Sequence, residues 1–130
     1  MGLRVGIDLT SVGTVEAALC DHAERYLERV YTEAEVSECR TPAGVDAERL
    51  ASRFAVKEAV MKVLRPSEHD AVPWNTIEVR RAQSGVIEIE LTGAALALAE
   101  AAGLEGLTAS LTHEADVAAA VAVAEAEVAE

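Results

Sequence analysis

The chain has few aromatic residues, few cysteines and little positive charge. Its 130 residues include one tryptophan, two tyrosines and one phenylalanine, so alanine, valine and leucine must build most of the core. Two cysteines, Cys20 and Cys39, do not make a disulfide framework and match no metal-binding spacing, which favours a reduced, cytoplasmic protein. The net charge of −12 argues against general nucleic-acid binding and against anionic membranes, because phosphate backbones require a basic footprint.

Long hydrophobic runs are also missing. The sequence contains no uninterrupted stretch of 18 apolar residues and opens with no basic region followed by a hydrophobic segment, so we expect neither a transmembrane helix nor a signal peptide. Because 51% of the residues are hydrophobic, disorder is not expected either. The length favours a single domain over residues 1–130.

Caps, turns and alternation predict the secondary structure. Thr32 and Glu35 match a capping box, Asp46 can cap a long helix, and Gly85 fits a hairpin connection. The expected strands cover residues 4–12, 76–82, 86–92, 107–113 and 117–124, and the expected helices cover 14–29, a short segment after Thr32, Asp46 to about Leu64, and 93–102.

Two segments carry particular patterns. In the first strand Val5, Ile7 and Leu9 share one face, which places Asp8 on the other. The last quarter is ambiguous, because its many alanines favour a helix while the alternation through residues 117–123 suits a strand. We favour two strands there.

The long helix contains four charged residues in otherwise apolar surroundings. At 100° per residue, Lys57 falls within the expected core-facing quadrant, Arg53 lies beside it, and Glu58 and Lys62 occupy the flank. One interpretation is structural: Arg53 and Lys57 extend out of the core edge, and Glu58–Lys62 is a surface i,i+4 pair. The other is functional, since desolvating even one charge is costly and four on one apolar side are unusual.

Three segments together resemble the signatures of the 4'-phosphopantetheinyl transferases, and most closely the small holo-acyl-carrier-protein synthase group. The first is Gly6-Ile7-Asp8-Leu9. The second runs from Arg53 to Lys62 and reads RFAVKEAVMK. The third is Ser110-Leu111-Thr112-His113-Glu114. The resemblance spans essentially the whole chain.

This resemblance implies a specific reaction. The family transfers the 4'-phosphopantetheine arm of coenzyme A to a serine of an apo acyl carrier protein or carrier domain and releases 3',5'-ADP. By resemblance Asp8 and Glu58 hold Mg²⁺, Lys62 faces the diphosphate, and Glu58 helps to deprotonate the serine, directly or through a metal-bound water. The nucleotide phosphates would be bound by Arg53 and His113, with Ser110 and Thr112 nearby and Lys57 as a further member of the cation cluster.

The resemblance also implies an α+β fold, with an antiparallel sheet on the long helix, and a homotrimer whose active sites lie between subunits. Two positions depart from the family. Thr14 stands where an arginine usually helps to dock the acidic carrier, and Gly85-Val86-Ile87 replaces a glycine, a basic residue and a proline. The alternative function is a non-catalytic nucleotide-binding or assembly module on the same fold, against which the presence of Asp8, Glu58 and Lys62 together argues.

Overall fold

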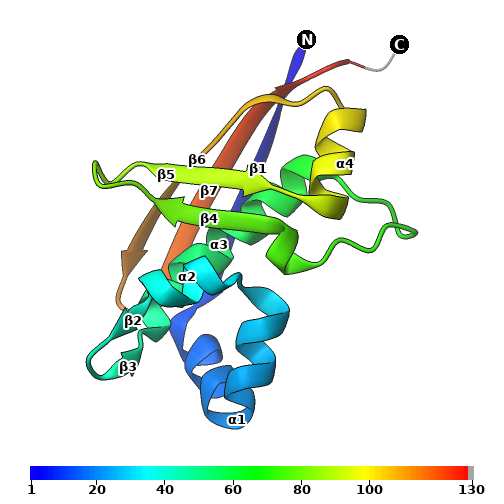
Figure 1. The fold of residues 1–130 in the computed structure, drawn as a ribbon. Helices are drawn as coiled ribbons and strands as arrows, with labels where there is room; N and C mark the ends of the chain where they lie inside the picture. Colours follow the sequence, from blue (N-terminus) through cyan, green and yellow to red (C-terminus); the bar gives the residue numbers. More distant parts are fainter. Residues whose placement is uncertain (129–130) are drawn as a thin grey trace.

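The computed structural model describes residues 1–128 of the chain. It alternates helices and strands around one long central helix, α3 (Figure 1). The helices are α1 (Val12–Val30), α2 (Glu33–Glu38), α3 (Ala47–Leu64), the short 3₁₀ helix η1 (Trp74–Thr76) and α4 (Gly93–Ala101). The strands are β1 (Gly2–Ser11), β2 (Arg40–Thr41), β3 (Gly44–Val45), β4 (Ile77–Arg81), β5 (Ile87–Leu91), β6 (Glu105–Glu114) and β7 (Val117–Ala126).

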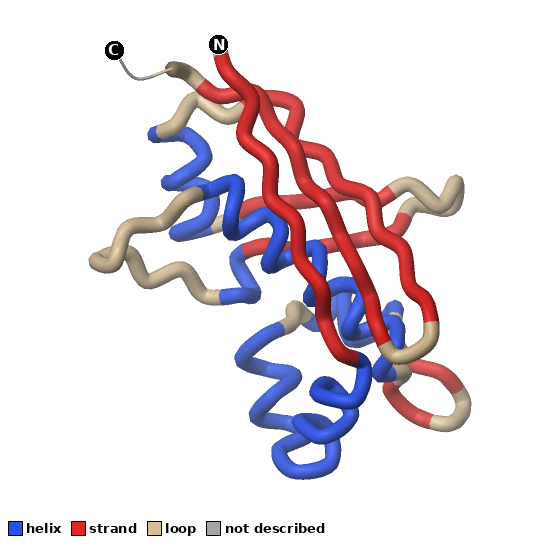
Figure 2. The backbone as a smooth tube through the Cα atoms, turned by 180° about the vertical axis from the view of Figure 1, so that it is seen from behind, coloured by secondary structure: helices blue, strands red, loops and turns tan. Residues whose placement is uncertain are grey.

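Three long antiparallel strands form the main sheet in the order β1-β7-β6. They lie side by side on one side of the molecule (Figure 2), while the separate hairpin β4–β5 crosses on the other side of α3 (Figure 1). Helix α3 is thus enclosed between the sheet and the layer made of α2 and β4. This arrangement is α+β with an antiparallel sheet packed on a long helix, as expected.

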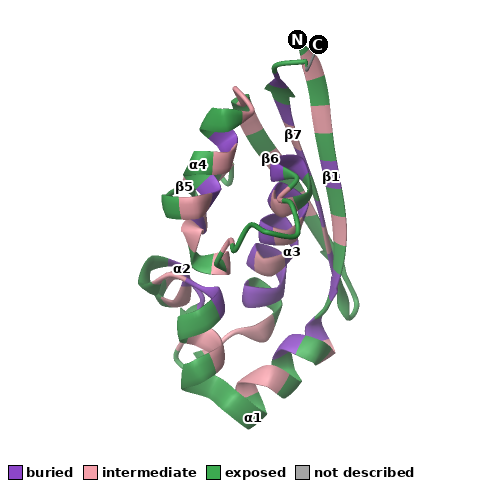
Figure 3. Cartoon of the chain, turned by 90° about the vertical axis from the view of Figure 1, so that its right-hand side faces the viewer, coloured by how far each residue is buried: buried purple, intermediate pink, exposed green. Residues whose placement is uncertain are grey.

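The sheet approaches α3 very closely because small residues line the contact. On β7 every second residue from Ala118 to Ala126 is an alanine that is at most 4% exposed. On β1 the contact falls at Gly6, where an added Cβ would stand 2.0 Å from the carbonyl oxygen of Ala59 on α3. Only glycine therefore permits β1 to lie where it does, and α3 is buried along most of its length (Figure 3).

The larger apolar side chains of the sheet point away from α3. Leu3, Val5, Ile7 and Leu9 on β1 are 61% to 70% exposed, and Val121 on β7 is 39% exposed. The register pairs Val5 with Val123 and Ile7 with Val121, so these residues form one continuous apolar surface, which we call the outer face. A single chain therefore leaves a large hydrophobic patch in contact with solvent.

Most of the expected elements are present. Thr32 and Glu35 form the reciprocal capping box, and Asp46 caps α3 through the backbone amides of Glu48 and Arg49. The last quarter is a strand pair, β6–β7. The hairpin β2–β3 was not expected, and α1 starts earlier than expected and is kinked at His22. Within the described residues, no helix is long and apolar enough to cross a membrane.

Candidate active site

Two carboxylates from different elements meet where β1 crosses α3. Asp8 lies on the inner face of β1, opposite Ala120 of β7, and its side chain is 12% exposed. Glu58 approaches it from α3. Burial, followed by hydrogen bonding to Asp8 and repulsion from its charge, raises the pKa of the Glu58 carboxyl to about 7, while Lys62 acts in the opposite direction. The two groups are close enough to disfavour simultaneous ionisation.

A lysine and a threonine complete this cluster. Lys62 is one helical turn after Glu58, and its Nζ lies 3.5 Å from Asp8 Oδ1 and donates to the carbonyl oxygen of Ile7 at 2.6 Å. Its side chain is 56% exposed, so part of the ammonium group is free to meet a ligand. Thr10, which was not predicted as a site residue, donates to the second carboxylate oxygen, Asp8 Oδ2, at 3.1 Å.

The chemistry of this donor set fits a divalent cation. Two adjacent carboxylates carry charge that raises a pKa, and a bound cation relieves that repulsion. Residues 1–128 contain no larger metal-binding group, that is, no set of three or more acidic, histidine or cysteine side chains that could hold a metal ion, so any ion here would have two protein carboxylates. Mg²⁺ suits such a site, because it is often bound by one or two carboxylates and completes its octahedron with substrate phosphates and water.

A second cluster is cationic and lies at the other side of α3. Arg49, Arg53 and Arg81 line a pocket of about 430 Å³ together with Glu38 and Ala82. Arg53 is only 6% exposed, so it does not extend into solvent as the structural interpretation expected. Its Nη2 donates to Glu38 Oε1 at 3.1 Å. Arg49 and Arg81 were not predicted: the i,i+4 spacing of Arg49 and Arg53 was a usable signal, whereas nothing local indicated Arg81.

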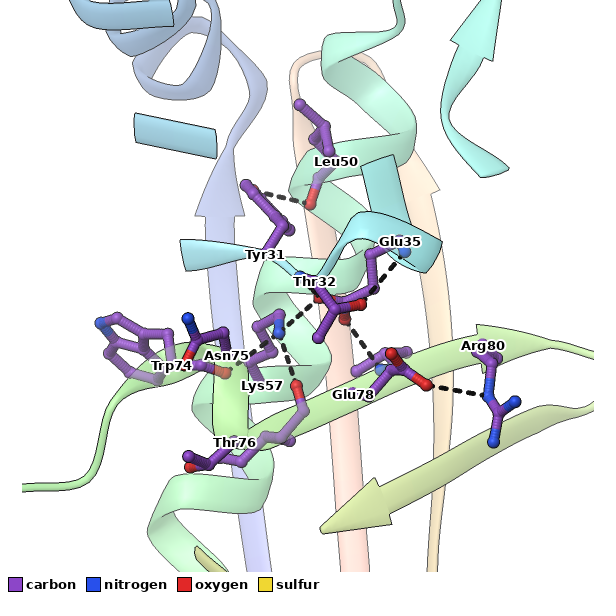
Figure 4. Close-up of polar contacts among 12 residues, drawn as sticks. Tyr31, Thr32, Glu35, Leu50, Lys57, Trp74, Asn75, Thr76, Glu78 and Arg80 are labelled. Carbon is purple, nitrogen blue, oxygen red and sulfur yellow. Dashed lines mark hydrogen bonds and ion pairs between the residues drawn. The ribbon is translucent and has the colours of Figure 1, made fainter. Parts of the chain in front are cut away.

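Lys57 lies in the core, which corrects the expectation that it joins the nucleotide-binding cations. Its Nζ is fully buried, 2.7 Å from Glu35 Oε1, and it donates to the carbonyl oxygens of Trp74 and Ile77 (Figure 4). All three ammonium hydrogens are thus used by the protein. Burial lowers the pKa of Lys57, and the charge and hydrogen bond of Glu35 oppose this effect.

The predicted residues of β6 lie apart from both clusters. Ser110 and Thr112 are opposite Val121 and Ala119 in the register, so they stand on the outer face of the sheet, away from Asp8. There they line a shallow pocket of about 230 Å³ beside Ile7. His113 points to the inner side, and its Nδ1 lies 3.3 Å from Glu48 Oε1 at the start of α3.

One chain therefore brings Asp8, Glu58 and Lys62 together but leaves the other predicted residues in separate places. Comparisons with known proteins bear on this arrangement. The family model of the 4'-phosphopantetheinyl transferase superfamily matches residues 4–122. The chain belongs to this superfamily.

Curated relatives and solved structures agree with the family. Holo-[acyl-carrier-protein] synthases of Myxococcus xanthus and Maridesulfovibrio salexigens are 44% and 36% identical to this chain. The first match covers 95% of both chains, and the second covers 96% of this chain and 99% of the relative. A coenzyme A complex of the synthase of Chronobacterium ammoniagenes superposes with a TM-score of 0.83 at 30% identity, covering 98% of this chain and 100% of that one. The synthase of Neisseria meningitidis gives 0.81 at 27%, covering 94% and 97%.

Proposed function

We propose that this chain is a single-domain, Mg²⁺-dependent transferase. It moves the 4'-phosphopantetheine arm of coenzyme A to a serine hydroxyl of an apo acyl carrier protein or carrier domain and releases 3',5'-ADP. The observation that carries the proposal is the cluster of Asp8, Glu58 and Lys62, found in a chain whose relatives are holo-acyl-carrier-protein synthases. Its two free thiols fit a cytoplasmic location.

The residues of the cluster divide the work of the transfer. The serine oxygen forms a bond to the phosphorus that carries the pantetheine arm, and the bond from that phosphorus to the bridging oxygen of the diphosphate breaks. Asp8 and Glu58 would hold Mg²⁺, which supplies charge neutralisation for the diphosphate. The Lys62 ammonium stabilises the negative charge that develops on the departing phosphate. Glu58 accepts the serine proton, directly or through water.

The guanidinium pocket would serve the remaining phosphate of the nucleotide. Arg53 is paired with Glu38 and lines the pocket with Arg49 and Arg81, so the pocket carries excess positive charge in an otherwise acidic protein. A guanidinium group presents several donors in one plane and matches phosphate oxygens well. We therefore propose Arg53 as the principal nucleotide-phosphate contact in the chain.

We further propose that the outer face is buried in a homotrimer. A patch that contains Val5, Ile7 and Val121 is unusual on a monomer, and burying it would stabilise an assembly. Ser110 and Thr112 lie on the same face, so the assembly would bring them against a neighbouring subunit. An active site between subunits would then contain β6 residues that one chain cannot deliver to its own Asp8.

Two experiments test these proposals. Mass spectrometry of an apo carrier protein, incubated with coenzyme A, Mg²⁺ and the protein, should show the added phosphopantetheine. The Glu58→Gln variant keeps the side-chain volume but removes the charge, and it should lose Mg²⁺-dependent transfer because the metal would lose a carboxylate ligand. Light scattering should report a trimer that Val5→Lys dissociates, whereas an active wild-type monomer would exclude an intersubunit site.

A further inference from the structure

Helix α2 presents two carboxylates, one turn apart, to the same pair of neighbours. The first is Glu35. Its Oε1 lies 2.7 Å from Lys57 Nζ on α3, and its Oε2 accepts the backbone N–H of Val79 on β4 at 2.8 Å. Both charged side chains are fully buried. Neither side chain is in contact with solvent, so Glu35 is the buried counter-ion of Lys57.

The second carboxylate, Glu38, contacts the same two elements, α3 and β4, but is partly exposed to solvent. Glu38 Oε1 accepts from Arg53 Nη2 on α3 at 3.1 Å and from the backbone N–H of Arg81 on β4 at 3.4 Å. The longer contact is weak, and the Glu38 side chain is 33% exposed. Glu38 can therefore leave without moving the backbone, which Glu35 cannot.

The site that Glu38 occupies is built for an anion. Arg53 is 6% exposed and lines the pocket with Arg49 and Arg81, so three arginines and one glutamate line it, although Arg49 also lies 3.8 Å from Asp46 Oδ2. The Nε of Arg53 is buried and has no hydrogen-bond partner anywhere in residues 1–128. A buried donor without a partner is costly, and this cost indicates that the present occupant does not satisfy the site.

We propose that Glu38 is a placeholder that a phosphate group of the nucleotide displaces from Arg53. This inference rests on the proposed function, which supplies the ligand. A phosphate monoester carries more charge than a carboxylate and offers more acceptor oxygens, so it uses more of the donors of Arg53 and its neighbours. Until the ligand arrives, Glu38 keeps Arg53 folded against the protein and lowers its affinity for other anions.

Removing the placeholder should tighten binding. Glu38→Gln deletes the competing charge but keeps a side chain of the same size, and we expect the Kd for 3',5'-ADP, measured by calorimetry, to fall about five-fold, which corresponds to about 1 kcal/mol. Glu90→Gln is the matched control, because it removes one charge from a surface Arg–Glu pair with Arg80 on the β4–β5 hairpin. It should leave the Kd unchanged at the same ionic strength.

A second variant of Glu38 is needed in case Glu38→Gln is unstable. Glu38→Asp preserves the net charge but shortens the reach to Arg53, so it should tighten binding by less than Glu38→Gln. Binding by both variants that is equal to or weaker than wild type would overturn the placeholder role, because a residue that only orients Arg53 must weaken binding when it is lost.

The outcomes separate this inference from the proposed function. If the wild type binds neither coenzyme A nor 3',5'-ADP, the proposed function fails. If it binds both and Arg53→Gln weakens binding while Glu38→Gln has no effect, only the placeholder role fails. Unchanged binding by Arg53→Gln would remove the phosphate subsite itself, and the placeholder role with it.

Discussion

Replacing Gly6 by alanine should damage both the fold and the active site. The new Cβ would stand 2.0 Å from the carbonyl oxygen of Ala59 and 3.0 Å from Lys62 Cβ. The closest obstacle is helix backbone, which cannot rotate away, so β1 must move by about 1 Å or more. Overpacking costs up to about 3 kcal/mol, and the lower entropy of the unfolded alanine chain returns at most about 1 kcal/mol. We expect a net loss of about 2 kcal/mol, or about 6–10 °C in Tm.

The functional effect of this change should exceed its effect on stability. Asp8 is two residues further along β1 on the same face, so the displacement separates its carboxylate from Glu58 and Lys62. A misplacement of about 1 Å in a catalytic constellation can reduce turnover about 100-fold. Melting and phosphopantetheine transfer should be measured below the Tm of the variant, at matched protein concentration and saturating Mg²⁺.

Gly13→Ala is the matched control. Its Cβ would meet only side-chain oxygens, Asp116 Oδ2 at 3.3 Å and Ser11 Oγ at 3.6 Å, and an alanine inside α1 favours the helix by up to about 1 kcal/mol. This variant should melt at or above the wild-type temperature with normal turnover. If Gly6→Ala behaved like Gly13→Ala, the close approach of β1 to α3 would not hold the site together.

Three further predictions concern the charged groups. In metal-free protein the raised pKa of Glu58 contributes stability that is fully present below pH 4.5 and is lost as pH rises through about 7. Urea unfolding in the presence of EDTA should show this decline in the wild type, and the Glu58→Gln variant should not show it. Added Mg²⁺ should reduce the decline in the wild type. Lys57→Met leaves Glu35 buried without its counter-ion and should cost about 3–5 kcal/mol, whereas adding Glu35→Gln should recover part of the loss, and a fully stable single variant would contradict the buried pair. Thr14→Arg should lower the KM for an acidic carrier with little change in kcat, and no change in KM would show that position 14 does not take part in docking.

Local signals explain why most elements were predictable. The capping box at Thr32, the N-cap at Asp46 and the turn glycine Gly85, which has a positive φ, each act within a few residues, so the sequence contains these signals directly. The hairpin β2–β3 was missed because its strands have two residues each. Only the turn between them is visible in the sequence, and their pairing depends on the fold around it.

Alternation predicted the sheet but does not reveal which face the helix covers. On β1 and β7 the large apolar residues are the exposed ones, and the buried positions hold glycine, alanine or, at position 10, threonine. A helix at ordinary distance would bury the valines and isoleucines instead. Because β1 contacts α3 closely at Gly6, the face with the small residues packs on the helix instead. The larger side chains are then left on the outer face, where only another chain could cover them.

The sequence could not predict which charged residues of α3 are accessible to a ligand and which are buried. Glu58 and Lys62 are i,i+4 neighbours on the side covered by β1, and Arg53 and Lys57 are i,i+4 neighbours on the side covered by α2 and β4. The same spacing thus gives an open cluster on one side and a closed ion pair on the other. The difference arises from Glu35. The capping box accounts for Glu35 through the hydrogen bond from the Thr32 N–H to its Oε1, so nothing in the sequence indicated that it also pairs with Lys57.

The two sides of α3 also constrain how a ligand is held. Arg53 and Glu58 are about 140° apart around the helix and about 7.5 Å apart along it, so no compact anion contacts both. A ligand that carries a diphosphate and a separate phosphate on a long nucleotide can reach both, provided that it passes around the helix or that a second subunit closes the gap. The exposed outer face, with Ser110 and Thr112 upon it, favours the second arrangement. Weakened nucleotide binding by a folded Val5→Lys monomer with an intact Arg53 would therefore be the direct sign that the site is shared between subunits.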